Sequence, residues 1–134
     1  MIRNILAVIG GLIVGMIANM ILVMVNMTVF PLPEGTNMWD PVQMKAALEG
    51  MPTAAWILPI VAHLAQAFVG GWVAARLGAS KPMLLAMIVG VLSLLGGVMN
   101  AVNIGSPAWT WIEMPLYLLA SWFAGRMEVQ RRGG

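Results

Sequence analysis

Long apolar stretches separated by short polar segments dominate this chain of 134 residues. A helix needs roughly 20 predominantly apolar residues to cross the hydrocarbon core of a bilayer. Four stretches meet that requirement if a few interior polar residues are allowed, and they cover residues 5–30, 53–77, 82–102 and 107–127. The pattern therefore predicts an all-α fold, an integral membrane four-helix bundle in a single transmembrane domain of residues 1–134.

Shorter signals predict where the helices begin and bend. Asp40 followed by Pro41, with Gln43 at the capping-box position, predicts a short interfacial helix over about residues 41–49 in the first outer loop. Proline in a helix interior removes a hydrogen bond, so Pro59 and Pro115 are expected to kink the second and fourth spans.

Composition narrows the class of protein. With 60% hydrophobic and only 9% charged residues, a soluble domain of this size is excluded, and the lipid bilayer is the expected surrounding. The absence of cysteine excludes disulfides, thiolate nucleophiles and metal sites built on cysteine. No catalytic motif is present, so neither an enzyme nor a cofactor is expected.

The basic residues predict the orientation. Cytoplasmic loops retain Lys and Arg during insertion, and only Lys45 falls on the outer side of the four-span pattern. The other six fall together on the opposite side: Arg3, Arg76, Lys81, Arg126, Arg131 and Arg132. Both termini of this multi-pass chain are therefore expected in the cytoplasm, and no nucleic acid is expected as a partner because the charges follow membrane topology.

Small residues recur at helical steps along each span. Because lipid gives little drive for apolar helices to associate, helix interfaces in membranes collect small residues that allow the backbones to approach. Five glycines are predicted to serve this packing role: Gly11, Gly15, Gly70, Gly90 and Gly97. Gly96 is expected to pack tightly as well.

The polar residues of the spans are predicted to converge in the outer half of the bundle. His63 and Glu113 stand out because an ionisable group inside a membrane is expensive and usually has a partner or a purpose. The rest of this candidate cluster consists of Asn26, Asn100, Gln66 and Tyr117. The pair could handle a proton or coordinate a cation, or it could serve only to hold the helices in register, and the structural role weighs more in so small a bundle.

Thirteen methionines are an unusual load. Met16, Met20, Met24 and Met27 repeat along the first span, and thioethers select copper(I). The favoured alternative is that methionine acts as a flexible hydrophobe at home in lipid. Whether any metal binds is not decided by the sequence.

One resemblance rests on the middle of the chain. The segments 31–35, Asp40-Pro41, Ala62-His63 and 70–76 are similar to a group of small bacterial four-span inner-membrane proteins of uncharacterised activity. The resemblance implies a four-span fold and the bacterial inner (cytoplasmic) membrane, and it brings no substrate or cofactor.

Two functions follow as expectations. The first is a structural or accessory subunit that joins a homo-oligomer or a larger membrane complex. The second is an oligomeric transporter or channel for a proton, a cation such as copper, or a small polar solute, which uses the His63 and Glu113 cluster. Size favours the first, because four short helices enclose little space.

Overall fold

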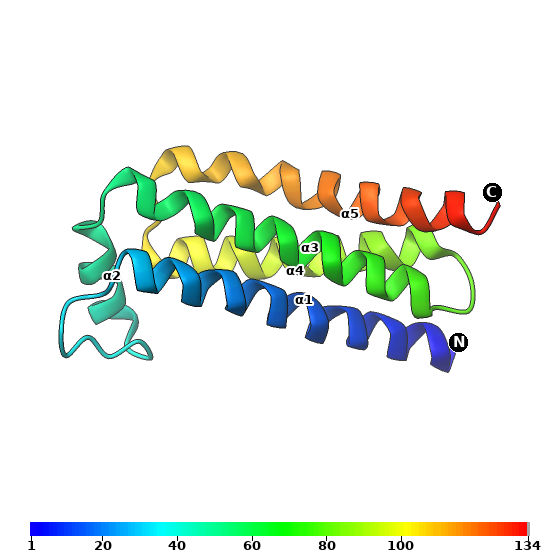
Figure 1. Ribbon diagram of the computed structural model, residues 1–134, viewed down its shortest axis with the longest axis horizontal. Coiled ribbons are helices and arrows are strands. Elements are labelled where there is room, and N and C mark those ends of the chain that lie inside the picture. The colour runs from blue at the N-terminus through cyan, green and yellow to red at the C-terminus, as the bar shows by residue number, and fades with distance from the viewer. Residues whose placement is uncertain (134) are drawn as a thin grey trace.

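The computed structural model describes residues 1–133, which form helices and connecting turns without a strand. The α-helices are α1 (Ile2–Val29), α2 (Pro41–Glu49), α3 (Ile57–Leu77), α4 (Pro82–Ile104) and α5 (Glu113–Arg131). Helices α1, α3, α4 and α5 lie alongside one another, with α1 and α5 on opposite sides of α3 and α4 (Figure 1). The predicted all-α bundle is present. We call the end that holds both termini the terminal end and the end that holds α2 the loop end.

Three helical segments are long and apolar enough to cross a membrane: Ile2–Val29, Thr53–Leu77 and Pro82–Ile104. These segments indicate a membrane protein. Helix α5 is not among them, because Glu113 opens it and three charged residues, Arg126, Glu128 and Arg131, occupy its last two turns.

The predicted helix over residues 41–49 is present as α2. The Asp40 carboxylate accepts a hydrogen bond of 2.9 Å from the backbone N–H of Val42, and Pro41 is the first helical residue. The side chain of Gln43 donates to the Asp40 carboxylate at 3.2 Å instead of returning to its backbone. Asp40 therefore caps the start of the helix as predicted, although the reciprocal half of the capping box differs.

Pro59 and Pro115 lie near the starts of α3 and α5, and the kinks predicted there stay a prediction. Each proline is the third residue of an α-helix that follows a 3-10 segment, Thr53–Trp56 before α3 and Ala108–Ile112 before α5. The first N–H groups of a helix have no partner within it, so proline is tolerated there. The two prolines thus mark helix starts.

Helix α1 packs mainly on α3 through a seam of glycines. A Cβ atom on Gly70 would lie 2.7 Å from the carbonyl oxygen of Gly11, and one on Gly15 would lie 2.6 Å from that of Gln66. The two backbones are therefore in direct contact, as the small-residue pattern predicts.

Side chains from the first and last helices hold the turn between α3 and α4 at the terminal end. Asn4 accepts a hydrogen bond of 2.7 Å from the N–H of Ala79, and Arg3 donates to the carbonyl of Leu77 at 2.9 Å. Arg132 donates to the carbonyls of Ala75 and Gly78 at 2.7 and 3.0 Å. Basic residues from α1 and α5 therefore gather at one end of the bundle.

Candidate functional site

A cavity of about 510 Å³ lies in the half of the bundle nearer the loop end, between α1, α3 and α4. Residues of the first loop and of α2 cover its loop end, among them Leu32, Met44, Leu48 and Met51. The volume falls in the range of roughly 300–1,000 Å³ that small-molecule sites occupy. The cavity is therefore large enough for one small ligand.

The expected contact between His63 and Glu113 is present at the side of this cavity. Nδ1 of His63 lies 3.0 Å from Oε2 and 3.2 Å from Oε1 of Glu113. Glu113 is only 4% exposed and opens α5, while His63 comes from the second turn of α3 and lines the cavity. The other ring nitrogen, Nε2, makes no hydrogen bond within residues 1–133. One ring nitrogen of His63 is thus hydrogen-bonded to Glu113, and the other is free of hydrogen bonds within residues 1–133.

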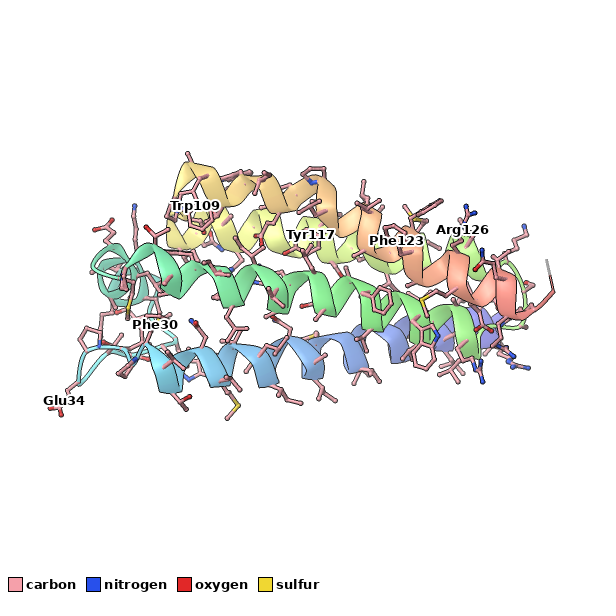
Figure 2. All side chains as sticks on the ribbon, turned by 45° about the horizontal axis from the view of Figure 1, so that its top comes forward. Phe30, Glu34, Trp109, Tyr117, Phe123 and Arg126 are labelled. Carbon is pink, nitrogen blue, oxygen red and sulfur yellow. The ribbon has the colours of Figure 1, made fainter. Side chains whose placement is uncertain are left out.

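Tyr117 extends this pair one helical turn along α5. Its ring stacks near that of His63, with 6.2 Å between the centroids and 19° between the planes. Figure 2 shows Tyr117 midway along the bundle, between Phe30 and Trp109 on the loop-end side and Arg126 on the other. Its ring fills the space that a side chain at Gly97 would need.

The structure brings the predicted polar cluster together. Five of its members line the cavity: Asn26, His63, Gln66, Asn100 and Tyr117. Glu113 does not line it and reaches it through His63. Asn26 also donates a hydrogen bond of 3.1 Å to the carbonyl of Ala55, which ties α1 to the segment before α3.

The cavity is also lined by two polar residues that the predicted cluster omits, Asn19 and Ser93. The Asn19 and Asn26 side-chain oxygens and the Ser93 hydroxyl are buried without a hydrogen-bond partner. Most buried polar atoms in proteins have a partner, so each exception calls for an explanation. In the sequence, the signal that could have identified Asn19 and Ser93 is their position on the small-residue stripes of the first and third spans.

Three glycines of α4 differ in how much space surrounds them. A Cβ atom on Gly90 would collide with the side chain of Ser121, and one on Gly97 would collide with the Tyr117 hydroxyl. Gly96 has no atom within 4 Å of the place where its Cβ would stand, and it lines the cavity. The tight packing expected at Gly96 is therefore wrong, because that position faces open space.

The methionine stripe of α1 is split between two surroundings. Met16, Met20 and Met27 line the cavity, whereas Met24 does not and is 61% exposed. No group of three or more His, Cys, Asp or Glu residues that could hold a metal occurs within residues 1–133. Three of the four methionines therefore form part of the cavity wall, and a thioether copper site stays a hypothesis.

A cluster of charged residues around Glu128 lies at the terminal end. The sequence analysis did not predict this cluster. The Glu128 carboxylate is fully buried and pairs with Arg131, with Arg132 at 3.0 Å and with Arg76 at 3.6 Å. The hydrogen bond from Arg131 is the main cause that lowers the pKa of Glu128 to about 2, and Arg132 and Arg76 lower it further. This cluster joins the ends of α3 and α5 and lies far from the cavity along the helices.

No family model, curated protein or solved structure matches the chain at a significant level. The resemblance to small bacterial four-span proteins stays an expectation. The geometry of the cavity is consequently the observation that bears on function.

Proposed function

We propose that the protein is a transport-type membrane protein that binds a proton, a cation or a small polar solute at the cavity beside His63 and Glu113. The contact between these two side chains at the cavity wall carries the proposal. A buried carboxylate and the imidazole that is hydrogen-bonded to it can hold or release a proton together. The free Nε2 of His63 would give this pair access to a ligand.

The proposal includes the topology that the charges predict. Helix α5 would be the fourth span, since residues 114–125 carry no charge and the charged residues stand at its two ends. Both termini would lie in the cytoplasm, as the positive-inside rule expects. The bacterial inner membrane is the proposed location.

Assembly of several copies belongs to the proposal as well. One chain encloses a cavity near the loop end, while the half near the terminal end is closed by the glycine seam of α1 and α3. A continuous path would need either movement of α1 or surfaces from another copy. A homo-oligomer is therefore the proposed working form.

Flux into liposomes tests the function. We expect purified protein in vesicles that contain a pH-sensitive dye to accelerate proton entry driven by a potassium diffusion potential. His63→Leu and Glu113→Gln should each slow that entry at least about tenfold, because a proton-transferring group is lost. Val61→Leu, at an exposed position of α3, the helix that carries His63, should keep the wild-type rate of proton entry.

The opposite result would be equally clear. Wild-type vesicles that conduct protons, sodium and potassium no faster than protein-free vesicles would contradict the transport function. Chromatography of each variant in detergent would show that it keeps the wild-type assembly, so that a slow rate reports on the site rather than on misfolding.

An accessory subunit is the second candidate function, and the surface of α1 favours it. Of its 28 residues only Ala7, Gly11 and Gly15 are buried. A long apolar face consequently meets either lipid or another protein. Purification of the native protein in mild detergent should then yield a fixed stoichiometric partner, whereas recovery of this chain alone would speak against it.

A further inference from the structure

We propose that the cavity selects a lipophilic molecule bearing hydrogen-bond donors, a primary amine above all, and that this ligand enters sideways from the bilayer between α1 and α4. The inference rests on the proposed function, since it names the ligand class of the same cavity. Shape, free polar atoms and charge each support it.

The shape of the cavity indicates entry from the side. Its loop end is covered by the first loop and α2, so direct access from that end is restricted. Among the lining residues, Met16 and Met20 of α1 are 56% and 53% exposed, and Gly96 and Asn100 of α4 are exposed too. These exposed lining residues belong to two helices that are apolar enough to cross a membrane, which favours a mouth between α1 and α4. A ligand that reaches this mouth must first dissolve among acyl chains.

The wall suits an apolar body of variable shape. Most lining side chains are apolar, and five of them are methionines: Met16, Met20, Met27, Met44 and Met51. Methionine has three rotatable bonds and a polarizable sulfur, so such surfaces adapt to different apolar partners. The wall by itself is therefore expected to select a ligand by its size more than by its exact shape.

The free polar atoms favour a donor. The Asn26 amide nitrogen is engaged with the carbonyl of Ala55, which leaves its side-chain oxygen as a free acceptor. The side-chain oxygen of Asn19 is a second free acceptor, and the hydroxyl of Ser93, which is 3% exposed, can also accept. Rotation of these buried side chains toward the cavity would let an N–H or O–H group of a ligand supply the missing partners, whereas a ligand with acceptors alone would leave the two amide oxygens unpaired.

The charge of the wall favours a cation over an anion. Within residues 1–133, no Lys, Arg, Asp or Glu lines the cavity, and His63 and Tyr117 are its titratable residues. The carboxylate of Glu113 contacts His63 from outside the cavity lining. The basic partner that an anionic ligand would find in the wall is the His63 imidazole, which already contacts the Glu113 carboxylate, whereas an ammonium group would be attracted toward Glu113.

Calorimetry with three probes that share one naphthyl body tests the inference. The probes are 1-naphthylmethylamine, its N,N,N-trimethylammonium derivative and 1-naphthoate, each also titrated into protein-free micelles to subtract partitioning. We expect the primary amine to bind, the quaternary cation to bind at least about tenfold more weakly because it has no donor, and naphthoate not to bind.

Variants link the binding to the cavity. Ser93→Ala should weaken amine binding severalfold and yet raise the Tm of the empty protein, because it removes a buried hydroxyl without a partner. Gly96→Leu should abolish amine binding, since the new side chain would grow into open space. Leu95→Ala, at an exposed neighbouring position that does not line the cavity, should leave the affinity unchanged.

Several outcomes would overturn the inference. Equal affinity for the primary and quaternary amines would show that donors are not recognised, and amine binding that persists in Gly96→Leu would place the site elsewhere. Preference for naphthoate, or no binding of any probe, would overturn the ligand class. Proton or cation flux that still depends on His63 would then leave the proposed function standing.

Discussion

Glu128 shows how a single buried carboxylate can organise one end of the molecule. It lies three and four residues before Arg131 and Arg132, a spacing that places all three on one face of α5. Arg132 then reaches the carbonyls at the end of α3, and Arg76 approaches from α3 itself. Ionised Glu128 therefore joins two helices, and its lowered pKa reports that linkage.

The pH dependence of stability should reveal this carboxylate. The pKa of Glu128 falls from 4.5 to about 2 on folding, so its stabilising effect is complete above about pH 5 and is lost as the pH falls toward 2. Glu128→Gln should lower the Tm by about 5 °C at neutral pH, and this difference should shrink toward zero in acid. Tryptophan fluorescence during heating would measure it.

Glu34→Gln is the matched control for that measurement. Glu34 is exposed and makes no ion pair within residues 1–133, so its replacement should leave the Tm unchanged at either pH. A Tm difference for Glu128→Gln that stays constant from neutral to acid pH would contradict the role assigned to the ionised carboxylate.

At the scale of elements, the seam between α1 and α3 depends on the absence of side chains at particular positions. The spacing of small residues predicted which faces meet, and Gly11, Gly15 and Gly70 do meet. The spacing could not show that Gly96 faces a cavity while Gly97 touches Tyr117, because both belong to the same glycine pair. That difference depends on the rotation of α4 against α5, which only the packed bundle defines.

Adjacent glycines in α1 provide a test of the seam. Gly11→Ala should destabilise the protein by about 1–3 kcal/mol, since its Cβ would collide with the backbone of α3. Gly10→Ala should be neutral or slightly stabilising, because its Cβ would meet only Leu77 at an ordinary distance of 4.0 Å. Chemical denaturation in detergent would compare the two, and equal stability would contradict the close backbone contact.

At the scale of the whole molecule, the arrangement of charge and the arrangement of helices agree with the proposed orientation. Both termini lie at the same end of the bundle, where Arg3 and Arg132 bind the turn that follows α3 (Figure 1). The loop that holds α2 lies at the opposite end. If the positive-inside rule holds for this chain, the bundle inserts with its terminal end in the cytoplasm, as proposed.

Cysteine labelling in intact cells should report that orientation directly, because the natural chain has no cysteine. A membrane-impermeant maleimide should label Glu34→Cys, in the loop near α2, without lysis. It should label Ala79→Cys, in the turn after α3, only once the cells are opened, since both positions are exposed but lie at opposite ends. Labelling of both in intact cells would contradict the proposed topology.

The sequence by itself determined the helical class, the capping of α2 by Asp40 and the faces on which small and polar residues lie, because these depend on hydrophobic length, local capping and helical periodicity. Only the tertiary structure decided that His63 meets Glu113, that Asn19, Asn26 and Ser93 surround a cavity with unpaired atoms, and that Glu128 gathers three arginines. Such contacts join residues distant along the chain, and they depend on how each helix is rotated and shifted against its neighbours. A one-dimensional pattern carries no direct measure of that rotation.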